Sequence, residues 1–233
     1  MVKSDLEKLR SFAAFAKLGD EAFRALVGAC TQRNYAPREL IMGQQDQSHD
    51  VVFLIDGRAR VNVYSPDGQR VSLREMAAGV MIGELSAIDG QTRSASVEAV
   101  EPCSIAIMPR RVFIKALSDH PEFGLAVMRH ITQLVRRLTD RVFEFSTLVV
   151  RGRVQAELLR MIEDMPKTRG ELVLSPAPTH EEIASRVSTH REAVTRELAW
   201  LEAQGVVEKT GRTLKITNLE RLRNLARESF HGE

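Results

Sequence analysis

The sequence has few of the residues that build metal centres or covalent chemistry. Its 233 residues include two cysteines, Cys30 and Cys103, with no CxxC pair and no cysteine–histidine spacing of the zinc or iron–sulfur type. The six histidines are scattered without an HExxH pattern, and a lone histidine such as His130 is usually structural or solvated rather than a metal or haem ligand. No nucleophile–base set and no P-loop is present, so we expect neither an enzyme nor a metal or cofactor site.

Long apolar runs and a strong charge of one sign are also missing. No segment approaches the roughly 20 apolar residues that a membrane-spanning helix needs, and the start MVKSDLEKLR lacks the apolar core of a signal peptide. We therefore expect a cytoplasmic protein without a membrane partner. The net charge is +2, and residues 151–233 hold 14 Lys and Arg against 13 Asp and Glu. Bulk charge does not indicate a nucleic-acid partner, so such a case must rest on where the charges lie.

The first half of the chain changes from helical to β-type patterning. Apolar residues recur at helical spacing over residues 4–27, which predicts short helices. From Thr31 to Pro109, short β-prone stretches are separated by turn signals such as Asp56-Gly57 and Asp89-Gly90. The run ARVNVYSPDGQRVSLREM reads as a hairpin around a Pro-Asp-Gly turn. Many short strands at this spacing predict a barrel or jelly roll.

A long helix is predicted from Pro121 to about Val150. Its apolar residues step by 3, 4, 3, 4, 3 and 4. This seam consists of Met128, Ile131, Val135, Leu138, Val142, Phe145 and Val149. A period of 3.5 residues favours two helices that supercoil, hence a homodimer, over one amphipathic helix packed within its own subunit. Gly152 interrupts the pattern near a predicted hinge. A helix over RVQAELLRMIEDM follows and ends at Pro166, and a strand follows in GELVLSPAP.

The stretch GELSAIDGQTRSAS combines an anion-binding turn with a carboxylate. Gly83 lets a ligand approach the backbone, and ELSAI can form one helical turn whose free N–H groups face an anion. Arg93 can bind a phosphate through a two-pronged fork, and Ser94 adds a hydroxyl. Glu84 would repel the phosphate, but it would accept a hydrogen bond from a ribose hydroxyl, and a cyclic nucleotide carries both groups. The alternative is a salt-bridged turn of Gly83, Glu84 and Arg93 that holds no ligand.

The stretch THEEIASRVSTHREAVTREL predicts two short helices joined by a tight turn. Thr179 and Glu182 form a capping box, and the turn lies at Ser188-Thr189. The outward side of the second helix carries Arg191, Glu192, Thr195 and Arg196. Arginine can bind guanine in the DNA major groove and glutamate can accept from cytosine. On spacing alone, base reading and a solvated charged face with a Glu192–Arg196 pair both remain open.

These motifs resemble those of a known family. GELSAIDGQTRSASV resembles the phosphate-binding cassette of cyclic-nucleotide-binding domains, and DVVFLIDGRARVNVY resembles the strand–glycine–strand signature of that fold. The run RExVxR followed by LEAQGVVEKTGRTLKI resembles the recognition helix and wing of the Crp/Fnr family of transcription regulators, in particular the cyclic AMP receptor protein type. The resemblance extends from about Phe15 to Thr217.

The resemblance implies an α+β fold in three parts. These are a cyclic-nucleotide-binding β-barrel (a jelly roll or double-stranded β-helix) over residues 1–117, a dimerisation helix and hinge over 118–150, and a winged helix-turn-helix over 151–233. It implies a dimeric, allosteric regulator that binds double-stranded DNA with TGTGA-like half-sites and meets RNA polymerase. The implied nucleotide-binding residues are Gly83, Glu84, Leu85, Ser86, Arg93, Ser94 and Thr139. The implied DNA-binding residues are Thr179, Ser188, His190, Arg191, Glu192, Thr195, Arg196, Lys209 and Arg212.

Two positions depart from the family pattern. The resemblance places Leu138 and Thr139 where relatives contact the purine, and only Thr139 can hydrogen-bond an adenine amino group. Cyclic AMP is therefore the expected effector, while Ser94 would suit a guanine in the syn conformation, so cyclic GMP, another effector or none stay open. His190 replaces the Ser or Thr common in the family, which puts one phosphate contact in doubt. The rival class, a kinase-type regulatory subunit, conflicts with the helix-turn-helix.

Overall fold

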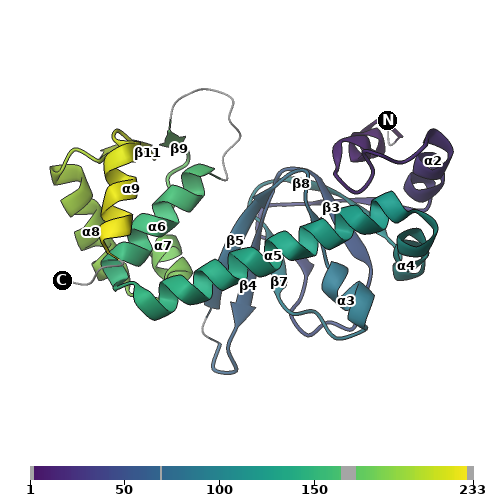
Figure 1. The fold of residues 1–233 in the computed structure, drawn as a ribbon, viewed down its shortest axis with the longest axis horizontal. Coiled ribbons are helices and arrows are strands. Elements are labelled where there is room, and N and C mark those ends of the chain that lie inside the picture. Colours follow the sequence, from purple (N-terminus) through teal and green to yellow (C-terminus); the bar gives the residue numbers. More distant parts are fainter. Residues whose placement is uncertain (1–2, 69, 164–171, 230–233) are drawn as a thin grey trace. The chain divides into compact units, whose positions relative to one another are not determined.

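The computed structural model describes residues 3–68, 70–163 and 172–229, which divide into two compact units, 1–135 and 136–233. The helices of the first unit are α1 Lys3–Leu6, the 3-10 helix η1 Glu7–Ser11, α2 Asp20–Gly28, α3 Glu84–Asp89 and α4 Arg110–Asp119. The long helix α5, Pro121–Thr147, begins in the first unit and ends in the second (Figure 1). None of the described helices has both the length and the apolar character needed to cross a membrane.

The strands of the first unit form two four-stranded antiparallel sheets. One has the order β1-β8-β3-β6 and the other β2-β7-β4-β5. Their bounds are β1 Thr31–Tyr35, β2 Leu40–Met42, β3 Val51–Asp56, β4 Arg58–Tyr64, β5 Arg70–Ala77, β6 Met81–Ile82, β7 Ser96–Ala99 and β8 Cys103–Met108. The predicted β-rich domain and its β4–β5 hairpin are therefore confirmed.

Strand β3 explains how one sheet can be covered on both faces. Its first five residues are all buried, as expected for a continuous apolar run rather than an alternating one. Val52 and Leu54 point into the core between the two sheets, whereas Val51, Phe53 and Ile55 pack against the N-terminal helices, α4 and the start of α5. The stretch GELSAIDGQTRSAS begins directly after β6, which pairs with β3, so this double-sided core fixes where the stretch starts.

Phe15 is the centre of the helical side of this core. It is fully buried, and its ring makes edge contacts with Phe23, Phe53 and Phe123 at centroid distances of 6.1, 5.0 and 5.5 Å. Edge-to-face geometry is the arrangement that aromatic quadrupoles favour. Phe123 belongs to α5, so this cluster ties the start of the long helix to the first unit.

Beyond the end of α5, the described part of the second unit contains four helices and a three-stranded sheet. Its elements are α6 Val150–Glu163, β9 Val173–Leu174, α7 His180–Arg186, α8 Arg191–Ala203, β10 Val207–Thr210, β11 Thr213–Ile216 and α9 Leu219–Glu228. The sheet order is β10-β11-β9, and both pairings are antiparallel. The capping box is present: the hydroxyl of Thr179 accepts from the backbone N–H of Glu182, and the Glu182 carboxylate accepts from the backbone N–H of Thr179.

The break between the long helix and the next falls at Leu148 and Val149, close to the hinge predicted near Gly152, and Gly152 itself lies inside α6. Gly152 has a packing reason, because a Cβ at this position would lie 2.5 Å from the Cβ of Ser229, at the end of α9. The predicted end of this helix at Pro166 and the first residues of the GELVLSPAP strand lie outside the described residues. Helices α4 and α9 were not expected from the sequence.

Phe15→Ala should destabilise the first unit selectively. Removing a fully buried phenylalanine leaves a cavity, and the expected loss of unfolding free energy is about 3–5 kcal/mol. Both tyrosines, Tyr35 and Tyr64, lie in the first unit and the single tryptophan, Trp200, lies in the second. In a urea titration the tyrosine transition should move to lower urea while the Trp200 transition stays. Phe143→Ala, at a 56% exposed position, is the control that should move neither.

Candidate functional site

Gly83 and Arg93 form the centre of a cradle at the start of α3. Gly83 has a φ of +86°, and a Cβ there would lie 2.5 Å from Nη1 of Arg93, so only glycine fits. The Arg93 guanidinium is 4% exposed and donates to the Gly83 carbonyl (3.0 Å), the Asp50 carbonyl (2.6 Å), the Ser86 hydroxyl and the Ser48 hydroxyl (3.2 Å). These bonds fasten α3 to the segment that precedes β3.

Arg93 is a buried cation without a direct anionic partner. Among the described residues, no carboxylate oxygen lies within 4.0 Å of its guanidinium, and its four acceptors are neutral. Burial lowers the pKa of Arg93, while the more distant charges of Asp50, Asp46 and Glu84 act in the opposite direction. Four of the five N–H groups of the guanidinium have protein acceptors, which leaves one for a further anion. Burying a charge of this kind costs free energy unless a nearby anion compensates it.

The other predicted cradle residues are divided between buried and exposed positions. Glu84 and Ser86 are 4% and 3% exposed, whereas Leu85 and Ser94 are exposed. The Glu84 carboxylate lies 3.3 Å from Nε2 of His130 on α5. Thr139 is exposed and belongs to the second unit, whereas the cradle residues belong to the first. The structure therefore does not place Thr139 relative to the cradle.

The seam residues of α5 present an apolar stripe to solvent. The exposed fractions reach 59% for Met128 and 67% for Val142. Val135, Leu138, Phe145 and Val149 are exposed as well, and Ile131 is half-buried. An apolar face of this length on a single chain is typical of a surface that a partner covers.

The second predicted site lies on α7, α8 and the wing. Val194, Leu198 and Leu201 bury one side of α8, and Arg191, Glu192, Thr195 and Arg196 are exposed on the other. Ser188 adopts a φ of +49° in the tight turn. His190 is the N-cap of α8 but makes no side-chain capping bond, a role that Ser or Thr could fill. Lys209 on β10 and Arg212 at the hairpin tip are exposed.

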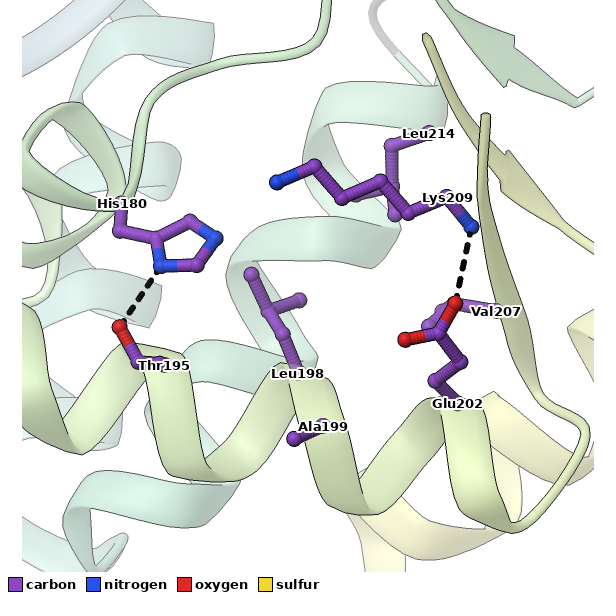
Figure 2. A pocket seen from close by; sticks show the side chains of 8 residues that line it. All are labelled: His180, Thr195, Leu198, Ala199, Glu202, Val207, Lys209 and Leu214. Atoms are coloured by element: carbon purple, nitrogen blue, oxygen red, sulfur yellow. Dashed lines mark hydrogen bonds between the residues drawn. The ribbon is translucent and has the colours of Figure 1, made fainter. Parts of the chain in front are cut away.

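A small pocket of about 170 Å³ separates α8 from the wing (Figure 2). His180 Nδ1 lies 2.7 Å from the Thr195 hydroxyl, which also donates to the Arg191 carbonyl at 3.0 Å. Figure 2 shows the Lys209 side chain extending toward the His180 ring. Burial lowers the pKa of His180, and the charges of Lys209 and Arg191 lower it further. No sequence motif predicts this contact, because it joins side chains of two different helices, α7 and α8.

A buried carboxylate joins the end of α5 to the helix-turn-helix. Glu157 on α6 is 2% exposed and receives Arg141 of α5 at 2.7 Å, Arg186 of α7 at 3.2 Å and Arg160 of its own helix. Arg160 also donates to both carboxylate oxygens of Glu144 on α5, at 2.6 Å. This cluster has no local sequence motif, because its members span 45 residues of the chain, from Arg141 to Arg186.

No metal site and no reactive thiol emerges from the described residues. They contain no group of three or more His, Cys, Asp or Glu side chains placed to hold a metal ion. Cys30 is buried, and burial raises the pKa of its thiol to about 12, so the thiol stays protonated and inert at neutral pH.

Comparison with known proteins identifies both halves of the chain. Residues 32–120 match the family model of the cyclic nucleotide-binding domain, and residues 152–225 match that of the Crp-like helix-turn-helix domain. The chain is 25% identical over 222 residues to the CRP-like cAMP-activated global transcriptional regulator of Mycobacterium tuberculosis, covering 95% of this chain and 99% of the relative. It is 28% identical to the cAMP-activated global transcriptional regulator CRP of Pasteurella multocida, covering 84% and 95%.

The solved structures agree with this fold. FixK2 from Bradyrhizobium japonicum superimposes with a TM-score of 0.75 at 21% identity, covering 84% of this chain and 96% of that one. The relatives and the matched fold are transcription regulators rather than enzymes.

Glu157→Gln should loosen the second unit. The change leaves three guanidinium groups around an uncharged side chain, and breaking a buried ion pair costs about 3–5 kcal/mol. Trp200 fluorescence during urea unfolding measures the loss, and the tyrosine transition should not change. Glu208→Gln, an exposed position on β10, is the matched control. A Glu157→Gln protein as stable as the wild type would show that the cluster is not a structural joint.

Proposed function

The chain belongs to the Crp/Fnr family of transcription regulators, and we propose that it is a homodimer that binds cyclic AMP and reads a palindromic DNA site in response. The observation that carries the effector proposal is the buried Arg93 guanidinium, which has neutral acceptors and no carboxylate beside it. A cyclic phosphate supplies the missing anion, and the N–H groups at the start of α3 point toward the same place. Ser86 and Ser94 add hydroxyl groups, and Leu85 forms an apolar edge.

We assign recognition of the ribose to Glu84. A nearly buried carboxylate beside a phosphate site is unfavourable unless it accepts hydrogen bonds, and a ribose 2′-hydroxyl donates one. Thr139 is proposed to meet the adenine amino group from α5. Leu138, next to it, offers no hydrogen bond, so selection between adenine and guanine rests on fewer groups than in a site with two hydroxyls.

Dimerisation is proposed along the exposed stripe of α5. Met128, Val135, Leu138, Val142 and Phe145 repeat at the 3.5-residue period of a two-stranded coiled coil and lie open to solvent on the single chain, with Ile131 half-buried among them. A second copy of the same helix would cover them. A symmetric dimer also presents two recognition helices, which suits a palindromic site with half-sites about 34 Å apart.

The DNA contacts are proposed on the exposed side of α8. Arg191 and Arg196 would bind guanines and Glu192 would accept from a cytosine, as in TGTGA-like half-sites. The phosphates would be met by Thr179, Ser188, His190, Lys209 and Arg212. The Thr195 hydroxyl is held by His180 and the Arg191 carbonyl, so we assign it packing against the base edge through its methyl group. Contact with RNA polymerase in the cytoplasm completes the proposal.

The proposed switch couples the two sites through α5. Nucleotide bound at the cradle and at Thr139 would change how the two seam helices pair, and this would set the spacing of the recognition helices. A coupling of about 1–3 kcal/mol, or about 5- to 150-fold in DNA affinity, is typical of such regulators.

Arg93→Lys should weaken cyclic AMP binding about 10- to 150-fold, because lysine keeps the charge but loses hydrogen bonds to a charged group. Isothermal titration calorimetry with cyclic AMP and cyclic GMP measures the affinity, and tyrosine emission checks the fold. Arg60→Lys is the control, since Arg60 is a half-buried arginine already paired with Glu75. Wild-type protein that binds neither nucleotide would overturn the effector proposal. An Arg93→Lys protein that binds like the wild type would instead move the site elsewhere.

Glu192→Ala should relax specificity at one base pair of each half-site. Discrimination there is expected to fall by about 1–3 kcal/mol, because the acceptor for the cytosine amino group is gone. Fluorescence anisotropy with a panel of singly substituted operators, in the presence of cyclic AMP, measures this. Glu220→Ala, exposed on α9, should leave the pattern unchanged. If Glu192→Ala weakens binding to every operator alike, Glu192 does not read a base.

A further inference from the structure

His130 of α5 places an unsatisfied nitrogen beside the cradle carboxylate. Its Nε2 lies 3.3 Å from Oε1 of Glu84, close enough for an ion pair. The same Nε2 is buried and has no hydrogen-bond partner among the described residues, because its geometry toward the carboxylate does not meet that of a hydrogen bond. The Glu84 side chain is 5% exposed and that of His130 20% exposed. The two polar groups are therefore adjacent but not bonded to each other.

A third group that both donates and accepts would satisfy this pair. Buried polar atoms in native proteins are nearly always hydrogen-bonded, so an orphan nitrogen at a candidate binding site calls for a partner. A carboxylate can only accept, and the histidine offers a donor when Nε2 carries its proton. A hydroxyl group that lies beside both side chains could donate a hydrogen bond to Glu84 and accept one from His130.

We propose that His130 and Glu84 together recognise the 2′-hydroxyl of the ligand's ribose, with His130 as a specificity residue contributed by α5. The inference rests on the proposed function, because it takes a ribose cyclic phosphate as the ligand. His130 lies outside the phosphate-binding cassette motif, so the proposal adds a residue that this motif does not contain. In the sequence, His130 is a solitary histidine on a helix, and only the packing of α5 against the first unit brings it to Glu84.

The position of His130 gives the ligand a direct contact with the seam helix. His130 lies between Met128 and Ile131, two of the seam residues, and about 100° around the helix from Ile131. A ribose held by His130 would fix the rotation of this part of α5 about its own axis. The hydroxyl contact would therefore report occupancy of the cradle to the proposed dimer interface.

The test compares cyclic AMP with 2′-deoxy cyclic AMP on two proteins. In the wild type, the deoxy ligand should bind more weakly. His130→Leu should weaken cyclic AMP binding about 3- to 12-fold, the range for one net hydrogen bond, while the affinity for the deoxy ligand stays within about twofold. The ratio of the two affinities, which measures the preference for the 2′-hydroxyl, should therefore be smaller in His130→Leu than in the wild type. His130→Gln keeps an N–H donor and should restore part of the preference.

The controls separate this inference from the proposed function. Gln133→Leu places the same leucine at an exposed position of α5 and should leave both affinities unchanged. A purely structural His130 would lower both affinities equally in His130→Leu and leave the preference intact, which would overturn the inference while cyclic AMP binding stands. A wild-type protein that binds neither ligand would instead remove the proposed effector.

Discussion

Burying a guanidinium is costly unless an anion lies beside it, and both units of this chain bury guanidinium groups. In the second unit the anion is internal, because Arg141, Arg160 and Arg186 converge on Glu157. Burial acts to lower the pKa of Arg160, but the charges of Glu157 and Glu144 outweigh it and raise that pKa. In the first unit Arg93 is only 4% exposed, yet it donates to carbonyl and hydroxyl oxygens alone. In the proposed function, the ligand phosphate would supply the anion that Arg93 lacks.

Helix α5 carries a residue of each kind of site. His130 contacts the cradle carboxylate, and Arg141, eleven residues later and about 16 Å along the helix axis, binds Glu157. The contact at Glu157 also includes Arg186 at the end of α7, the first helix of the helix-turn-helix. Within the second unit, the last part of α5 is therefore held to α6 and α7 by an ionic contact at a buried carboxylate. The break at Leu148 and Val149 lies beyond this contact, so it does not interrupt it.

Sequence reasoning succeeded where the determining interaction is local. The capping box of Thr179 and Glu182 spans three residues, the Gly83 turn needs a positive φ, and the heptad of α5 is a property of one helix. It failed where the partner is remote. The close packing of Gly152 against Ser229, which is 77 residues away, has no signal in the sequence. The contacts of Glu157, His130 and His180 likewise depend on which helices cross, and no spacing in the sequence encodes that. Helices α4 and α9 were not predicted either, although α9 carries apolar residues at helical spacing in LERLRNLARE.

The arrangement of the cradle separates recognition of the sugar phosphate from recognition of the base. In the proposed site, Arg93, Gly83 and the start of α3 would bind an anion and Glu84 with His130 would bind a hydroxyl, so these groups suit a ribose cyclic phosphate of any base. The predicted base contact, Thr139, lies on the part of α5 that belongs to the second unit and is next to Leu138 of the exposed stripe. In the proposed dimer, base selection would then depend on both chains rather than on one. It follows that a cradle able to bind both cyclic nucleotides can still give a regulator that responds to one, because only a base that fits at the seam changes how the helices pair.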